Sequence, residues 1–373
     1  MLHGERLDRP TYTLITSLDG GTSDVVLTDH EIFGIQVVQK TVSLLGVPDG
    51  VATSEPRVLE GLEHDHLVRV REAQWDPDHD EALQCITFTT DFYPGRSLLY
   101  ALEQGHEFSV RDVLEIVDGI LSALVYLHEE CGLLHRDIKL GNVMLAADMK
   151  HARLGDLALA AAMDPSTGTT EPANATPLYI APEAAAGALD VRSDLYQVGC
   201  VMLELLNGLL PYAEIDRDKV DSRLSEGRRP LSNPNYDPAP WVPANVARVL
   251  RKLVAQDPDR RYASAREALR AVRHLRCVGW QRIGGAALVG RWSGKYPPNV
   301  PAARARVYEV NAELVEKGKY QGQLLLTARW RNANSVDWRN YAGLTRRVPV
   351  EDARELASFF RDVEAKAHSA PTR

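Results

Sequence analysis

The sequence predicts an α+β protein with a β-rich first lobe, a helix-rich second lobe and a small α+β domain after them. Short β-branched runs dominate residues 11–93, and helical periodicity dominates residues 94–276. Residues 277–373 differ in charge, with 16 Lys and Arg residues against 9 Asp and Glu residues, a net charge of +7. The whole chain carries −8, so residues 1–276 carry −15. This asymmetry predicts separate modules, the basic one docked on the acidic one or binding an anionic partner.

The first lobe is predicted to be an antiparallel sheet. Its apolar residues form β-branched runs at 25–27, 35–38 and 86–90, with turn-rich pieces between them. One helical signal interrupts the strands near residues 54–63, where Ser54 can cap a helix. We therefore expect a sheet with one helix inserted into it.

The second lobe is predicted to be mainly helical after a short Pro94-Gly95 hinge. The clearest helix runs from Ser109, its expected cap, to Glu130. Apolar residues recur there at three- and four-residue steps: Val110, Val113, Leu114, Val117, Ile120, Leu121, Leu124 and Leu127. Further helices are expected over residues 193–207, 243–256 and 264–275. A junction between two such lobes favours a ligand cleft.

The C-terminal domain, residues 277–373, is predicted to contain a loop, a hairpin and a helix. Residues 279–301 read as a loop because they contain several Gly and Pro residues. Alternating apolar residues over 308–314 and 324–330 predict the hairpin, and the stretch from 350 to 367 predicts an amphipathic helix.

Composition is that of a globular protein, with 45% hydrophobic and 25% charged residues. The chain shows neither the apolar start of a secretory signal nor a run of roughly 18 apolar residues that could span a bilayer. We therefore expect a cytoplasmic location and no membrane partner. The four cysteines lie far apart and contain no CxxC pair, so we expect reduced thiols.

The strongest chemical signal is the string HRDIKLGN at residues 135–142. It resembles the catalytic loop of eukaryotic-type (Hanks-type) serine/threonine protein kinases. The resemblance implies the bilobed protein kinase fold and three roles. Asp137 would orient the substrate hydroxyl as the base, Lys139 would lie near the γ-phosphate of ATP, and Asn142 would bind Mg²⁺.

Two further segments follow in the order that this family has. Asp156-Leu157-Ala158 stands at the place of the metal-binding DFG turn, so the resemblance makes Asp156 the second Mg²⁺ ligand. Alanine there lacks the conformational freedom of glycine, which puts switching of this turn in question. The segment ATPLYIAPE at residues 175–183 resembles the end of an activation segment, and Thr176 is the mark of the serine/threonine branch.

The resemblance also implies structural supports for the catalytic loop. Thr176 would bridge Asp137 and Lys139 through its hydroxyl. The remaining supports would be an ion pair between Glu183 and Arg261 and a contact from Asp194 to the catalytic-loop backbone.

The segment between Asp156 and Ala181 carries four hydroxyls that could be phosphorylated: Ser166, Thr167, Thr169 and Thr170. A phosphate on this segment would pair with Arg136, because it adds about two negative charges opposite a fixed guanidinium. Regulation by loop phosphorylation is therefore one hypothesis. The other is that the hydroxyls only keep a flexible loop soluble.

Toward the N-terminus, Lys40 matches the family lysine that contacts the α- and β-phosphates of ATP, and Glu55 matches its helix partner. If Val26 is aligned with the family valine, Asp19, Gly21 and Asp24 stand where three glycines cover the phosphates. Only Gly21 is kept. Either the loop has another register, using Gly20-Gly21, or ATP binds more weakly.

The same resemblance assigns the adenine contacts. The Asp91 carbonyl and the Tyr93 amide would bind the ring edge, with Thr90 as the gatekeeper. The residues expected to sandwich the ring are Val26, Val38 and Met144.

The resemblance covers about residues 11–276 and predicts a serine/threonine protein kinase that uses ATP and Mg²⁺, phosphorylates protein substrates in signalling and autophosphorylates. The alternative is a pseudokinase scaffold that signals by binding. For the C-terminal domain, four tryptophans among basic residues allow nucleic-acid binding, but they equally suit the core of a small domain. Substrate recruitment or docking onto the kinase lobe is the preferred hypothesis.

Overall fold

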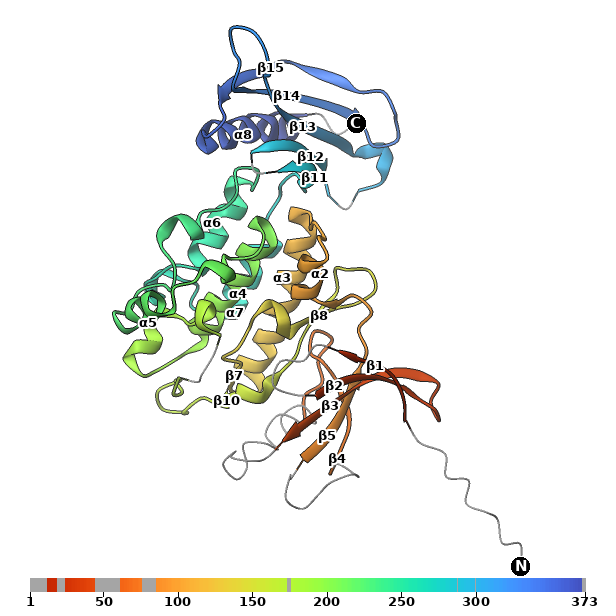
Figure 1. The fold of residues 1–373 in the computed structure, drawn as a ribbon, viewed down its shortest axis with the longest axis vertical. Helices are drawn as coiled ribbons and strands as arrows, with labels where there is room; N and C mark the ends of the chain where they lie inside the picture. Colours follow the sequence, from red (N-terminus) through yellow and green to blue (C-terminus); the bar gives the residue numbers. More distant parts are fainter. Residues whose placement is uncertain are drawn as a thin grey trace, which may run out of the picture.

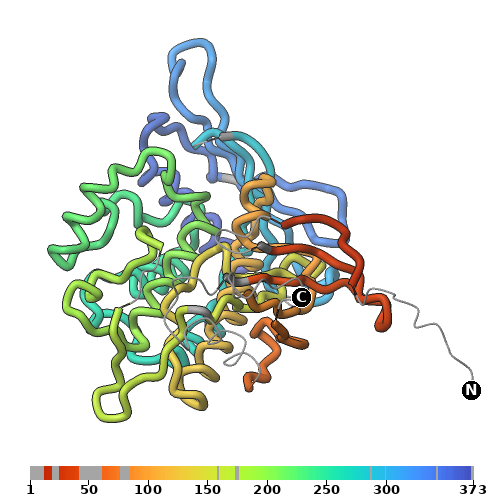
Figure 2. The backbone as a smooth tube through the Cα atoms, turned by 60° about the horizontal axis from the view of Figure 1, so that its bottom comes forward, coloured from red at the N-terminus to blue at the C-terminus, as the bar shows by residue number. Residues whose placement is uncertain are grey.

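A computed structural model describes residues 12–18, 24–43, 61–75, 85–172, 176–286, 288–298 and 300–370. Figure 1 shows three parts: a sheet near the N-terminus, a helical lobe, and a second sheet with one helix at the C-terminal end. In Figures 1 and 2 the red strands β1–β3 lie to the right of the green helices, and in Figure 1 the blue C-terminal domain lies above the helical lobe. None of the helices that the structure describes combines the length and the apolar composition of a membrane span.

The N-terminal sheet is antiparallel, with the strand order β1-β2-β3-β5-β4. Its strands are β1 (Tyr12–Leu18), β2 (Asp24–His30), β3 (Ile35–Ser43), β4 (Val70–Trp75) and β5 (Cys85–Asp91). The β-branched runs of the sequence form β2, β3 and β5, which confirms the predicted sheet. The helix expected near residues 54–63 lies, up to residue 60, outside the described residues.

The helical lobe is built around one long buried helix. Its helices are α2 (Leu98–Glu103), α3 (Val110–Val125), α4 (Val191–Asn207), α5 (Arg217–Ser225), α6 (Ala244–Leu253) and α7 (Ala265–Arg273). Ser109 and Asp112 form a capping box at the start of α3, and the predicted apolar stripe of this helix is buried. A π-helical turn over Tyr126–Glu130 continues α3. The cap of α4 is Asp190, earlier than the predicted start at Ser193, because its carboxylate accepts the Arg192 N–H.

Short strands hold the loops that carry the candidate site. One small sheet contains β6 (Arg96–Ser97), β8 (Val143–Leu145) and β9 (Ala152–Leu154), and another pairs β7 (Leu133–Leu134) with β10 (Ala161–Ala162). The HRDIKLGN string lies between β7 and β8, and Asp156 follows β9. Because β8 pairs with β9, the end of the HRDIKLGN string and Asp156 lie next to each other.

The C-terminal domain is a five-stranded antiparallel meander with a helix across one face (Figure 1). Its elements are β11 (Gln281–Ala286), β12 (Val289–Tyr296), β13 (Arg306–Leu314), β14 (Gln323–Asn332), β15 (Arg339–Pro349) and α8 (Ala353–Ser369). The predicted hairpin and closing helix are confirmed as β13–β14 and α8. The predicted loop over residues 279–301 is wrong, since β11 and β12 lie there. The glycines of these strands resemble turn residues in the sequence, although at Gly290 and Gly294 a tryptophan ring packs closely over the backbone.

The C-terminal domain and the helical lobe share one hydrophobic core. Trp280 and Trp292 are buried and contact Phe360 of α8, and Trp292 also lies 5.4 Å from Trp241 of the helical lobe between ring centres. The Val110 N–H of α3 donates to the Trp280 carbonyl at 2.7 Å. These two tryptophans therefore serve the core.

Candidate active site

The Asp137 carboxylate is held in place by two side chains of its own loop. Lys139 Nζ lies 2.7 Å from Asp137 Oδ2, and Asn142 Nδ2 donates to the Asp137 carbonyl at 2.8 Å and to its Oδ2 at 3.1 Å. The Asp137 side chain is almost completely buried. Such fixed geometry suits a carboxylate that must orient a reacting hydroxyl.

Asp194, on α4, holds the backbone of the catalytic loop by hydrogen bonds. Its carboxylate accepts the His135 N–H at 2.9 Å and the Arg136 N–H at 2.8 Å, and it pairs with His128 Nε2 at 2.8 Å. Although burial opposes ionisation, the His128 hydrogen bond, the charges of His128 and His135 and the His135 amide hold the pKa of Asp194 below its ordinary value. Arg136 has φ of 68°, a conformation uncommon for a residue with a side chain, and these hydrogen bonds stabilise it.

Gln197 is a further support that the sequence reasoning missed. Its side chain accepts the Ile138 N–H and donates to the Arg136 carbonyl, both at 2.9 Å. Gln197 lies one turn after Asp194 on α4, so helical spacing from Asp194 was the signal that could have found it.

Asp156 meets Lys40 across the two lobes. Lys40 Nζ, on β3, lies 3.2 Å from Asp156 Oδ1 and 5.6 Å from the centre of the Phe88 ring. Burial opposes ionisation of Asp156, but the ammonium of Lys40 and its hydrogen bond lower the pKa of this carboxyl. Asp156 has φ of 60°, and the Gly155 N–H before it donates to the Asn142 carbonyl at 2.9 Å. The Leu157 side chain that follows is buried in the core of the helical lobe.

The oxygen donors near Asp137 suit a hard divalent cation. Among the described residues, the Asn142 side chain makes two hydrogen bonds, both through its nitrogen, which leaves the side-chain oxygen as an acceptor. Asp156 contributes an ionised carboxylate. Carboxylate and amide oxygens are the ligands that Mg²⁺ prefers, so Asn142 and Asp156 fit the metal that the sequence implies.

Thr176 approaches the same carboxylate from the activation segment. Its hydroxyl lies 3.4 Å from Asp137 Oδ1, and its N–H lies 3.5 Å from the same oxygen. Within the described part of the chain, the Thr176 hydroxyl and N–H are hydrogen-bonded to Asp137 and not to Lys139.

The register of the N-terminal sheet bears on one adenine contact. In the β2–β3 ladder Val25 lies opposite Lys40, and Leu27 lies opposite Val38. Residues directly opposite in an antiparallel pair share a face, so Val25 and Leu27 share the face of Lys40 and Val26 lies on the other face. This register therefore does not support the adenine contact that the resemblance gives to Val26, and it favours Val25 in that role.

The other adenine candidates lie on β3, on β5 and just after it, and on β8. Thr90 lies opposite Val38 in the β3–β5 ladder and shares its face. Asp91 ends β5, where its carboxylate pairs with Arg71, and Tyr93 is buried under the Arg153 guanidinium, 5.1 Å from the ring centre. Met144 is half-buried on β8, and the remaining two ATP-site candidates, Gly21 and Glu55, lie outside the described residues.

The activation segment is ordered by local hydrogen bonds. The Asp164 carboxylate accepts from the Ser166 and Thr167 amides, and the Thr167 and Thr169 hydroxyls lie 2.8 Å apart. Thr170 exchanges two backbone hydrogen bonds with Leu189. The Arg136 guanidinium donates to the carbonyls of Leu159 and Glu171, so this cation already contacts the segment.

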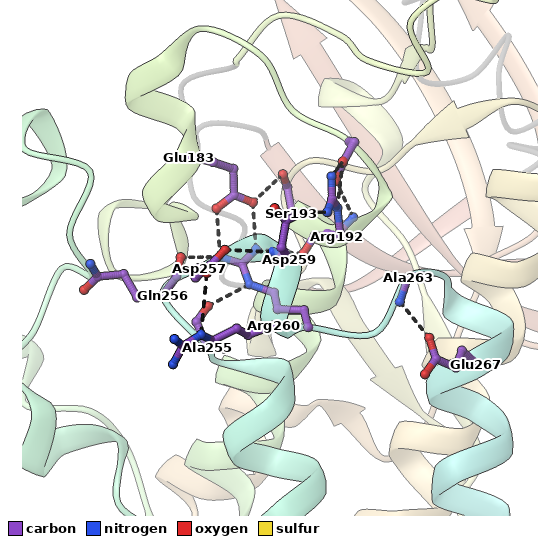
Figure 3. Close-up of polar contacts among 12 residues, drawn as sticks. Glu183, Arg192, Ser193, Ala255, Gln256, Asp257, Asp259, Arg260, Ala263 and Glu267 are labelled. Carbon is purple, nitrogen blue, oxygen red and sulfur yellow. Dashed lines mark hydrogen bonds and ion pairs between the residues drawn. The ribbon is translucent and has the colours of Figure 1, made fainter.

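Glu183 and Arg261 form a buried ion pair behind the segment. Two guanidinium nitrogens of Arg261 lie 2.7 and 2.8 Å from the two oxygens of Glu183. Arg261 also donates to the carbonyls of Ala255, Gln256 and Arg192. Figure 3 shows Glu183 facing Ser193, whose hydroxyl donates to it at 2.8 Å.

Comparison with known proteins agrees with this geometry. The protein kinase domain family matches residues 19–273. The chain is 32% identical over 299 residues to the probable serine/threonine-protein kinase SCO3848 of Streptomyces coelicolor, an alignment of 77% of this chain and 43% of that protein. It is 32% identical over 181 residues to the probable serine/threonine-protein kinase PknB of Bifidobacterium longum, covering 48% of this chain and 26% of that protein. It is 25% identical over 273 residues to the serine/threonine-protein kinase PrkC of Bacillus subtilis, covering 72% and 40%.

The chain spans less than half the length of these curated relatives. The matched region contains both the Asp137 loop and the Lys40–Asp156 pair, and it is more than half of the chain. The chain therefore belongs to the eukaryotic-type (Hanks-type) serine/threonine protein kinase family.

Proposed function

We propose that this protein transfers the γ-phosphate of ATP to serine and threonine hydroxyls of proteins, its own chain included. The observation that carries the proposal is the Asp137 carboxylate, which is fixed by Lys139 and Asn142 and approached by Thr176. Phosphoryl transfer needs a hydroxyl in line with the phosphate and compensation of charge on the phosphate oxygens. This site has groups for both tasks.

Each charged residue has one task in the transfer. Asp137 orients the substrate hydroxyl and accepts its proton as the oxygen–phosphorus bond forms and the bond to the β-phosphate oxygen breaks. Lys139 compensates charge on the γ-phosphate, and Lys40 contacts the α- and β-phosphates. Asn142 and Asp156 would hold Mg²⁺, which supplies charge stabilisation on the phosphate oxygens.

The register of β2 also bears on the phosphate-covering loop. If Val25 takes the place of the family valine, the three glycine positions fall on Leu18, Gly20 and Ser23 in place of Asp19, Gly21 and Asp24. This shift takes two carboxylates away from the positions that approach the triphosphate. It favours the reading in which the loop uses Gly20-Gly21.

Intact-mass analysis after incubation with ATP and Mg²⁺ tests the proposal. We expect wild-type protein to gain multiples of about 80 Da, the mass of a phosphoryl group, and the Asp137→Asn and Asp156→Ala variants to gain none. Mapping the added groups tests Thr167, Thr169 and Thr170 as acceptors. An unchanged wild-type mass, no phosphorylation of a generic protein substrate and no ATP-induced thermal shift would instead support the pseudokinase scaffold.

A further inference from the structure

A cavity of about 880 Å³ lies where the C-terminal domain meets the helical lobe. Its walls are one side of α3, the end of α7, the turn between β8 and β9, and the loop after β12. No candidate active-site residue lines it. Its volume is in the range of ligand sites, and domain junctions are a common place for them. We call it the junction cavity.

The junction cavity is basic although it lies mainly on an acidic region. Four cations line it: Arg111, Lys150, Arg273 and Arg276. The lining carboxylates are Glu115 and Asp118, so the formal charge of the wall is +2 without its histidines. Residues 1–276 carry −15 in total, so the sign of the charge reverses locally. Such a reversal attracts an anionic group to this point.

Two of the three ion pairs at the wall have a cation that is more exposed than its carboxylate partner, and in the third pair Arg111 and Glu115 are about equally exposed. Asp118 pairs with Arg273 at 2.6 Å, and the two side chains are 28% and 56% exposed. Lys150 pairs at 2.8 Å with Asp112, whose side chain is 16% exposed against 47% for the lysine. At Arg273 and Lys150 a ligand therefore meets the guanidinium and ammonium groups before the paired carboxylates.

Arg276 has no compensating carboxylate in the described part of the chain. Its guanidinium donates to the carbonyls of Arg273 and Leu275, at 3.1 and 2.9 Å. A carbonyl satisfies a hydrogen-bond donor but carries no full negative charge. Arg276 is therefore a cation available to a ligand.

Apolar groups complete the cavity and narrow the class of ligand. Leu114 and Val272 are buried in its floor, and the C-terminal domain adds Tyr296, Pro297 and Pro298. Cations on three separate segments suit charges spaced along a chain better than one phosphate held by converging amides. A long nucleic acid would also meet the negative charge of residues 1–276. An extended acidic peptide with apolar residues fits both observations.

We propose that the junction cavity binds an acidic, partly apolar segment of a protein substrate and so holds that substrate on the enzyme. This inference rests on the proposed kinase function. A second attachment point raises the effective concentration of the substrate hydroxyl at the active site without changing the chemistry there. The C-terminal domain would take part in this binding, because Tyr296, Pro297 and Pro298 form one wall of the cavity.

Fluorescence anisotropy with a labelled peptide tests the inference. The probe is a fluorescein-labelled peptide of roughly ten residues that alternates glutamate with leucine and proline, and the reference has lysine in place of glutamate. The full chain carries Asp137→Asn, so that binding is measured without phosphate transfer. We expect the glutamate peptide to bind, the lysine peptide not to bind, and added salt to weaken binding.

Charge reversal in the cavity should weaken binding specifically. We expect Lys150→Glu combined with Arg276→Glu to lower the affinity about tenfold, or about 1.4 kcal/mol. The matched control is Arg251→Glu, an exposed arginine on α6 that does not line the cavity, with a change of less than about twofold. Tyr296→Ser removes a wall group without altering charge and should also weaken binding.

Three results would overturn the inference: equal binding of both peptides, equal affinity in the reversed and control variants, or a DNA oligonucleotide displacing the glutamate peptide. The proposed function fails separately. If the peptide binds but the wild-type protein transfers no phosphate, the proposed kinase function is contradicted and the proposed binding site is still supported. If the protein transfers phosphate but does not bind the peptide, only the proposed binding site is contradicted.

Discussion

The Glu183–Arg261 pair shows how strongly one buried charge depends on its partner. The Arg261 side chain is completely buried, and Glu183 is its only carboxylate contact among the described residues. We expect Glu183→Ala to lower the free energy of unfolding by about 3–5 kcal/mol, because it leaves a guanidinium buried without a counter-charge. Urea denaturation followed by tryptophan fluorescence measures the change.

The neighbouring pair of Arg192 and Asp259 provides the control (Figure 3). The Asp259 side chain is 83% exposed, so we expect Asp259→Ala to cost less than about 1 kcal/mol. Similar losses in the two variants would show that burial does not decide the strength of these pairs.

Site residues that lie within one short motif could be located from the sequence. Site residues whose position depends on the register between two strands could not. Asp137, Lys139 and Asn142 lie within one short loop, so their mutual contacts follow from their spacing. The assignment of Val26 depended on the glycine pattern before it, which is degenerate. Only the β2–β3 register shows that Val25 shares the face of Lys40.

At the scale of elements, α3 was predictable and β11 and β12 were not. The α3 helix carries a cap and a buried apolar stripe, it contains no proline, and its one glycine, Gly119, is itself buried. The stretch from 281 to 296 contains four glycines, which the sequence pattern assigns to turns. The reason for one of them is packing. A Cβ at Gly294 would meet Val278 at 2.5 Å and the Trp280 ring at 3.1 Å.

Two alanine substitutions test this explanation of the β12 strand. We expect Gly294→Ala to lower the free energy of unfolding by about 1–3 kcal/mol, because a methyl group would overpack a buried site. Gly284→Ala is the matched control on β11, where a Cβ would meet nothing within 4 Å. We expect its effect to stay within about 0.5 kcal/mol. Thermal denaturation of both variants compares them, and equal destabilisation would contradict the packing argument.

At the scale of the whole molecule, the shared core predicts that the C-terminal domain and the helical lobe unfold together. Trp292 packs against Trp241 of the helical lobe and against Phe360, which also contacts Trp280, and the core includes residues of α3 and α4. Gln281 also donates to the Glu107 carbonyl of the helical lobe at 2.7 Å. A disturbance inside the C-terminal domain should therefore change the stability of the kinase lobe.

Glu364 of α8 provides such a disturbance through pH. Its carboxylate is buried beside the chain that joins the two parts, where it accepts the Val278 N–H at 3.1 Å. Burial raises the pKa of Glu364 to about 7 from the ordinary 4.5, against the opposing effect of that hydrogen bond. Between these values the folded protein keeps a proton that the unfolded chain releases. Stability should therefore fall as pH rises through this range, by about 2–3 kcal/mol from this group.

We expect Glu364→Gln to remove this fall, since the amide still accepts the hydrogen bond and carries no charge. The variant should match wild type near about pH 4.5 and exceed it by about 2–3 kcal/mol near about pH 8 in urea denaturation. Glu355→Gln, on the exposed side of the same helix, should change stability by less than about 1 kcal/mol at both values. If the parts unfold as one unit, hydrogen exchange of α3 amides will show the same gain at high pH. A gain confined to α8 and β11–β15 would instead mean that the C-terminal domain unfolds by itself in spite of the shared core.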